Sequence, residues 1–143
     1  MYQIIIADHQ ELYRAGIVAL LESRGECRVI AECSDWMGLV QAVRAESASF
    51  VIASIVLVTD LEWLILRTQE VSGRVLLVGE DADSLNCYRA TGAAGALHRS
   101  ASASVFLDTF QKTLKADEFA LPSDVSPVLH LTPRLARSLT QGN

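Results

Sequence analysis

Four short apolar segments of the chain each end in polar or glycine residues at which a cation or an anion could bind. These residues are Asp8 and His9, Ser54, Gly79 and Glu80, and His98 and Arg99. Carboxylates bind hard cations such as Mg²⁺ through oxygen, and a serine hydroxyl accepts a phosphoryl group when a base or a metal activates it. A guanidinium group neutralises anions. These residue types could therefore support metal binding and phosphoryl transfer, provided that the fold brings the four ends together.

The segments that carry these residues alternate with segments of helical periodicity. Apolar runs rich in β-branched residues predict five strands, at 1–7, 27–33, 50–57, 74–78 and 95–98. Apolar residues at helical spacing predict five helices, at about 10–23, 35–46, 60–71, 81–91 and 102–115. Five strand–helix units joined by short loops require a parallel sheet with helices on both faces. In such a sheet, ligands bind at the carboxyl ends of the strands, which is where the polar residues lie.

The composition favours one domain that does not itself bind nucleic acid. The chain has 143 residues, half of them hydrophobic and a fifth charged, and a net charge of −5. Binding to DNA depends on clustered lysines and arginines, whereas the 12 basic residues here are scattered along the chain.

The three cysteines, Cys27, Cys33 and Cys87, have no spacing typical of a metal site, and we expect free thiols in a reducing compartment. The sequence has no secretory signal, and its longest apolar stretch, at 50–59, is too short to span a bilayer. We therefore expect a cytoplasmic protein that makes no contact with a membrane.

Three longer stretches resemble the receiver domain of response regulators of the NarL/FixJ/LuxR type. They are IIIADHQELYRAGIVALLE at 4–22, RVIAECSDW at 28–36 and GAAGALHRSASASVFLDTFQKTLKADEFALP at 92–122. The resemblance covers residues 1–122 in element order and loop length. It implies an α/β fold of the flavodoxin or CheY type, which is a doubly wound sheet of five parallel strands in the order 2-1-3-4-5 with five helices.

The same resemblance implies a phosphorylation site that has lost most of its parts. A working receiver holds Mg²⁺ with two acidic residues, which correspond here to Asp8 and His9, and its aspartate nucleophile corresponds to Ser54. The family's threonine or serine corresponds to Gly79, and its lysine corresponds to Arg99. A single carboxylate beside an imidazole is a poor site for Mg²⁺. We therefore expect an atypical receiver with a vestigial site, no catalytic residue, no metal, no cofactor and no enzymatic activity.

Other interpretations of these residues remain open. Phosphate could still be accepted on Ser54 or Asp60, or the vacated pocket could bind a small molecule. Arg99 could bind an anionic ligand, although an ion pair with Asp8 is the simpler expectation. The imidazoles of His9 and His98 could form a pH-sensitive pair, although ordinary surface histidines are more common.

The predicted function is phosphorylation-independent regulation of transcription through dimerisation or contact with another regulatory protein. The possible dimer face lies on the helix at 102–115 and consists of Val105, Phe106, Phe110 and Leu114. We expect a receiver domain at 1–117, followed at 118–143 by a linker and by LTPRLARSLTQGN, which resembles the start of a helix-turn-helix output domain. That output domain is either truncated or vestigial, and because it lacks a recognition helix we expect DNA binding only through a missing C-terminal part.

Overall fold

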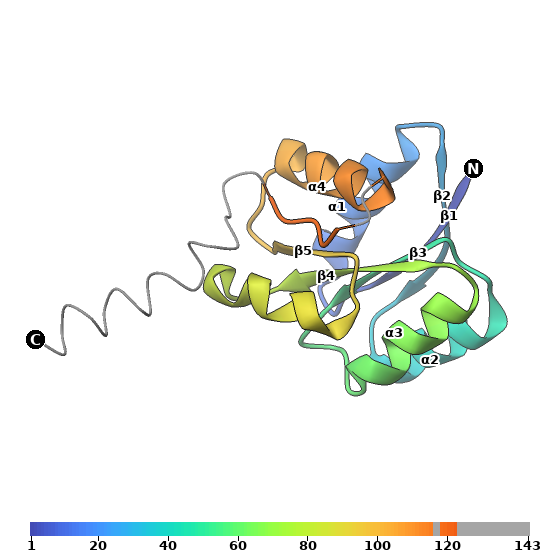
Figure 1. Cartoon of the computed structure of the whole chain (residues 1–143). Helices are drawn as coiled ribbons and strands as arrows, with labels where there is room; N and C mark the ends of the chain where they lie inside the picture. The colour runs from blue at the N-terminus through green and yellow to red at the C-terminus, as the bar shows by residue number, and fades with distance from the viewer. Residues whose placement is uncertain (116–117, 123–143) are drawn as a thin grey trace, which may run out of the picture.

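A parallel sheet of five strands forms the centre of the molecule, in the order β2-β1-β3-β4-β5 (Figure 1). The computed structural model describes residues 1–115 and 118–122. The strands are β1 (Tyr2–Ala7), β2 (Cys27–Cys33), β3 (Phe50–Ser54), β4 (Arg74–Gly79) and β5 (Gly95–His98). The helices are α1 (Glu11–Glu22), α2 (Trp36–Ala45), α3 (Leu61–Glu70), the 3₁₀ helix η1 (Ala82–Thr91) and α4 (Ala103–Lys115). This confirms the predicted fold class and strand order.

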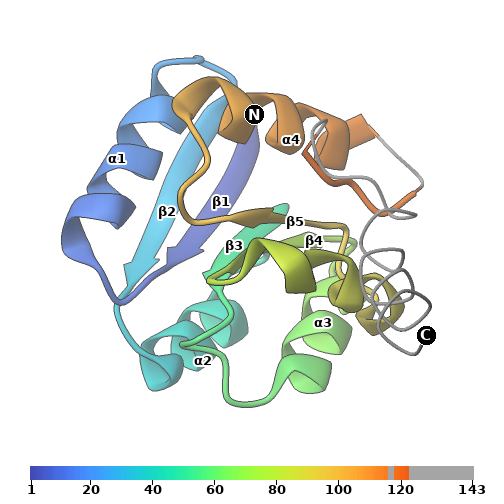
Figure 2. The ribbon, with the colours of Figure 1, turned by 90° about the vertical axis from the view of Figure 1, so that its left-hand side faces the viewer.

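The alternation of side chains along the strands divides the core into two layers. On β1 and β3, Ile4, Ile6 and Ile52 pack with α1 and α4 on one face of the sheet. Ile5 and Val51 pack with α2, α3 and η1 on the other face. Figure 2 shows the two groups of helices on opposite sides of the sheet. Because both faces are covered, these strands contain continuous apolar runs rather than an alternation of polar and apolar residues.

Two elements differ from the prediction. The strand predicted at 50–57 ends at Ser54, because the chain turns there and the Leu57 N–H donates to the Ser54 carbonyl at 3.1 Å. The apolar residues after Ser54 are explained by packing, since Leu57 is buried in the core below this turn. The fourth helix is a 3₁₀ helix, which forms i to i+3 hydrogen bonds.

The possible dimer face on the last helix needs correction. Phe106 and Phe110 are fully buried against the sheet, and the ring centroid of Phe110 lies 4.9 Å from that of Phe50. Val105 and Leu114 are half-buried. The apolar excess on this helix therefore fills the core under α4. Phe110 is closed off from any partner, and Phe106 can contribute only to the floor of a groove.

The segment at 118–122, which the sequence analysis assigns to the linker, contacts β5 through a bridge between Ala120 and Gly95. The LTPRLARSLTQGN stretch lies outside the described residues. Among the helices that the structure describes, none is both long and apolar enough to cross a membrane.

Candidate functional site

The carboxyl ends of β1, β3, β4 and β5 meet at one edge of the sheet, and one side chain connects all of them. Arg99 follows β5 and extends past β4 and β3 to the residue after β1. Its backbone N–H continues the ladder by donating to the Gly79 carbonyl at 3.0 Å, which fixes where the side chain begins. The sequence prediction that these four ends converge is confirmed for Asp8, Ser54 and Arg99.

Arg99 and Asp8 form a two-pronged ion pair. Arg99 Nη2 lies 2.7 Å from Asp8 Oδ2, and Arg99 Nη1 lies 3.1 Å from Asp8 Oδ1. The Asp8 residue is 2% exposed, and the Arg99 side chain is 14% exposed. A parallel pair of charge-assisted hydrogen bonds is the strongest arrangement available to these two side chains. The ion pair expected from the sequence therefore forms, and it is largely shielded from water.

The remaining N–H groups of the guanidinium also have acceptors. Arg99 Nη2 donates to Ser54 Oγ at 3.0 Å, and Nη1 donates to Gln10 Oε1 at 2.9 Å. Arg99 Nε donates to the Glu80 carboxylate at 3.1 Å. A guanidinium has five N–H groups, and each of them has an acceptor here. Burial lowers the pKa of Arg99, but the hydrogen bonds to Asp8 and Glu80 outweigh this effect and raise it above its usual value.

Tyr13, on the first turns of α1, covers one face of the guanidinium. The Arg99 Cζ atom lies 4.5 Å from the centroid of the Tyr13 ring, which is the geometry of a cation–π contact. Burial of the phenol raises its pKa to about 12, and the positive charge of Arg99 opposes that rise. Tyr13 therefore closes the site on the side of α1 with a ring that stays neutral at physiological pH.

The loop after β1 is held in place by further hydrogen bonds to Asp8. The Gln10 N–H donates to Asp8 Oδ1 at 2.8 Å, and Arg14 Nη1 donates to the Asp8 carbonyl at 2.8 Å. Arg14 is itself paired with Glu32 at 3.3 Å, at the end of β2. These contacts fix the direction of the Asp8 carboxylate toward Arg99.

The two histidines are not paired with each other in the contacts that the described residues make. His9 is exposed, and its Nδ1 lies 3.9 Å from Asp8 Oδ1. The His98 ring bonds instead to the Glu80 carbonyl through Nε2, and its Nδ1 accepts from the Ser100 N–H. This pattern assigns the proton of a neutral His98 to Nε2. Through its bond to the Glu80 carbonyl, the ring stabilises the loop after β4.

Gly79 has a packing role at the position where the resemblance places a hydroxyl. A Cβ atom added there would lie 2.7 Å from Leu85 Cδ2, on η1. The residue is buried, and its carbonyl accepts from the Arg99 backbone. Any larger residue at 79 requires the Leu85 side chain to shift.

The side chains at the strand ends do not match the needs of Mg²⁺. This cation requires an octahedron of oxygen ligands. Both Asp8 oxygens accept from Arg99, and the Ser54 hydroxyl accepts from the same guanidinium. Within 1–115 and 118–122, no three His, Cys, Asp or Glu side chains gather in a way that could hold a metal.

Sequence reasoning missed the roles of Gln10, Tyr13 and Glu80. The sequence marks Glu80 only as a residue that follows a strand, and it assigns no role to Gln10 or Tyr13. All three lie within a few residues of a strand end that contributes to the site. The sequence therefore places these residues near the strand ends, but it does not show that their side chains point toward Arg99.

Comparisons with known proteins show the fold. No protein-family model matches the chain, and no curated protein matches it in sequence. A two-component response regulator of the LuxR family from Aurantimonas sp. SI85-9A1 is similar in structure, with a TM-score of 0.76 and 17% identity over 95% of this chain and 99% of that one.

Two further solved structures are similar. The signal receiver domain of the putative response regulator NarL from Mycobacterium tuberculosis has a TM-score of 0.67 and 19% identity over 80% of this chain and 98% of that one. RcsB from Salmonella enterica serovar Typhimurium, bound to promoter rprA in the presence of phosphomimetic BeF3-, has a TM-score of 0.69 and 15% identity over 99% of this chain and 67% of that one. At such identities, the likeness establishes a receiver fold.

We predict that Arg99→Met lowers the free energy of unfolding by about 3 kcal/mol, because it leaves the Asp8 carboxylate buried without a cation. The double variant Asp8→Asn with Arg99→Met should lose less, since no unpaired charge remains in the core. Urea denaturation at neutral pH measures both variants. A loss below about 1 kcal/mol in Arg99→Met would show that the ion pair is dispensable.

The raised pKa of Tyr13 predicts a loss of stability at alkaline pH. The folded phenol titrates at about 12 and the unfolded one at about 10.0, so the unfolded chain releases this proton first as the pH rises. The contribution of the neutral Tyr13 phenol to the free energy of unfolding is therefore complete below pH 10 and is lost between pH 10 and 12. Tyr13→Phe should remove this part of the alkaline loss when unfolding is measured across that range. If the free energy of unfolding falls with pH equally steeply in the parent and in Tyr13→Phe, Tyr13 is not the group that causes the loss.

Proposed function

We propose that this chain is an atypical receiver domain of a response regulator that works by contact and without phosphorylation. The observation that carries this proposal is the occupation of the strand-end site by Arg99, whose five N–H groups all have acceptors. The guanidinium supplies from within the chain the positive charge that a metal would bring to Asp8. A receiver arranged in this way needs no phosphoryl group to keep its strand-end loops in one position.

Neither alternative phosphate acceptor is equipped for the reaction. The Ser54 hydroxyl is buried and accepts a hydrogen bond from Arg99. The Asp8 carboxylate forms an ion pair with the same guanidinium, so it does not act as a base for this hydroxyl. Asp60 is the N-cap of α3, where its Oδ1 accepts from the Trp63 N–H at 3.0 Å. A cap carboxylate stabilises the start of a helix and needs no further role. A small-molecule ligand would also have to displace Arg99 from the strand ends.

A groove between α1 and α4 supports the second part of the proposal, which is action through a second copy of the chain. Its volume is about 580 Å³, and its walls are mostly apolar or small. The lining residues are Leu12, Tyr13, Gly16, Ile17, Ala19, Leu20, Ser23, Ala101, Ser102, Ala103 and Phe106. Small residues on a helix allow another helix to approach closely, and a Cβ atom added at Gly16 would meet nothing within 4 Å.

Leu12 points to a second copy as the occupant of this groove. It is 89% exposed although it is a large apolar residue, and it lies at the rim of the groove. In a two-fold dimer, each partner presents the same patch, so Leu12 of one copy can enter the groove of the other. Another regulatory protein is the alternative partner, and DNA would be reached only through an output domain after this one.

We predict that incubation with acetyl phosphate and Mg²⁺ adds no phosphoryl group to the protein, as judged by intact mass. The reason is that Arg99 occupies both Asp8 and Ser54. Ser54→Ala and Asp60→Asn serve as locating controls. An adduct on the parent protein that disappears in either variant would refute phosphorylation independence and identify the acceptor.

We predict that the protein associates into dimers and that Leu12→Arg weakens the association at least about tenfold, because it places a charge in an apolar interface. Leu66→Arg is the matched control, since Leu66 is 54% exposed but lies on α3, on the opposite face of the sheet. Sedimentation velocity over a range of concentrations measures both. A parent protein that stays monomeric, or equal weakening by the two variants, would contradict the groove as the dimer face.

A further inference from the structure

The segment at 118–122 is attached to the outer edge of β5 by an isolated parallel bridge between Ala120 and Gly95. The Ala120 N–H donates to the Ala94 carbonyl at 2.9 Å, and the Ala96 N–H donates to the Ala120 carbonyl at 3.0 Å. Ala120 and Leu121 are buried, and Leu121 belongs to the core layer under α2 and α3. In Figure 1, the segment runs in orange-red beside β5 and below α4. The edge strand of the sheet is therefore covered by the chain itself.

This pairing depends on the absence of a side chain at Gly95. A Cβ atom there would lie 2.8 Å from the Ala120 carbonyl oxygen and 3.0 Å from Thr113 Oγ1. The strand addition is also limited at its other end, because Pro122 has no N–H with which to continue the ladder. The segment is thus held at one bridge by two backbone hydrogen bonds.

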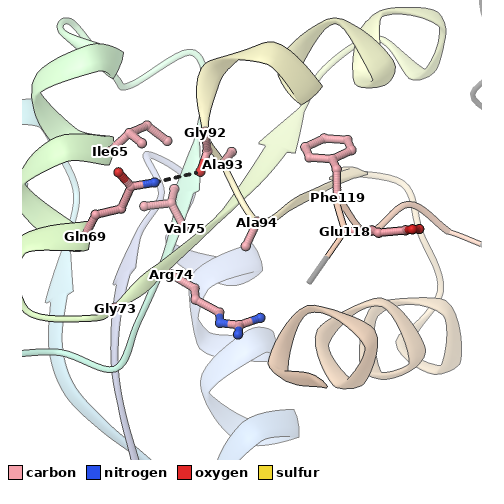
Figure 3. A pocket seen from close by; sticks show the side chains of 10 residues that line it. All are labelled: Ile65, Gln69, Gly73, Arg74, Val75, Gly92, Ala93, Ala94, Glu118 and Phe119. Atoms are coloured by element: carbon pink, nitrogen blue, oxygen red, sulfur yellow. Dashed lines mark hydrogen bonds between the residues drawn. The ribbon is translucent and has the colours of Figure 1, made fainter. Parts of the chain in front are cut away.

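Packing on one side of the segment is incomplete. A cavity of about 280 Å³ lies between Phe119, the end of α3 and the first residues of β4 (Figure 3). Phe119 is half-buried, and the Arg89 Cζ atom lies 5.2 Å from the centroid of its ring. Glu118 is exposed at the rim of the same cavity. A side chain beside a cavity lacks contacts on that side, so it is held less firmly than a core residue.

We propose that residues 118–122 form a releasable sixth strand, which sets where the chain leaves the domain and, when released, opens the edge of β5. The docked state fixes the chain at Ala120. The released state frees that anchor and exposes the backbone groups of Ala94 and Ala96. This inference does not depend on whether the protein is phosphorylated or dimeric, because the segment lies at the opposite ends of β4 and β5 from Arg99.

Native-state hydrogen exchange tests the proposal in the complete chain. The amides of Ala96 and Ala120 should exchange at least about tenfold faster than those of Val51 and Ile52, at a rate that low concentrations of denaturant do not change. Such behaviour indicates local opening without unfolding of the domain. If the amides of Ala96 and Ala120 exchange only with the core, at a rate that denaturant increases, the segment is a fixed part of the domain and the proposal is overturned.

Two variants make the test specific. Gly95→Ala should raise the exchange rate of Ala120 by a further factor of about ten or more while β1 and β3 are unaffected. Met37→Ala is the control, because Met37 is exposed on α2 and lines neither the bridge nor the groove between α1 and α4. If Gly95→Ala does not fold, Ala120→Pro removes one of the two hydrogen bonds, and the Ala96 amide, which donates to the Ala120 carbonyl, is then the reporter. No acceleration of Ala96 exchange in a folded variant of either kind would refute the bridge as the anchor.

Discussion

The buried carboxylate of Asp8 is the constraint on which the rest of this structure depends. A carboxylate that is 2% exposed cannot remain charged in an apolar core without a close cation and further hydrogen bonds. Arg99 provides the cation, and the Gln10 N–H provides an additional bond. Since Asp8 follows β1 while Arg99 follows β5, satisfying this one charge ties β1 to the edge strand β5 across β3 and β4. The pair therefore organises the whole carboxyl edge of the sheet.

The short strand β5 receives support at both ends. At its carboxyl end, His98 bonds to the Glu80 carbonyl and Arg99 bonds to the Glu80 carboxylate, so the loop after β4 is held on two sides. At its amino end, Gly95 lies against the segment at 118–122. One strand of four residues thus lies between the site around Arg99 and the segment at 118–122.

Much of the fold could be predicted because the strands are buried on both faces. Continuous apolar runs such as 50–54, separated by helical periodicity, leave few arrangements other than a doubly wound parallel sheet. The meeting of Asp8 and Arg99 followed from the same reasoning, since strand ends converge. The roles of Phe106 and Phe110 could not be predicted in this way. Helical periodicity identifies an apolar face but does not show whether the sheet, or a partner, covers it.

The remaining differences concern residues that carry almost no signal in a sequence. Ala120 and Gly95 have small side chains without chemistry, yet their backbones form the only parallel bridge beside the named strands of the described chain. Hydrogen bonds of Gln10 and Glu80 to one arginine depend on loop geometry, which residue types do not determine. Contacts through backbone atoms and through long flexible side chains are therefore the part of this site that required a structure.

The side chains at the strand ends are mutually compatible in charge and hydrogen bonding. With an aspartate at position 54, two carboxylates would lie together in the buried part of the site, and one guanidinium would leave an excess negative charge that favours a metal. With Ser54, the buried charges of Asp8 and Arg99 balance, and the hydroxyl accepts the N–H that would otherwise have no partner. A lysine at 99 would present three donors on a flexible stem, whereas the planar fork of arginine reaches Asp8, Ser54, Gln10 and Glu80 at once. Ser54 and Arg99 therefore support each other, and an aspartate at 54 or a lysine at 99 alone would leave a buried group unsatisfied.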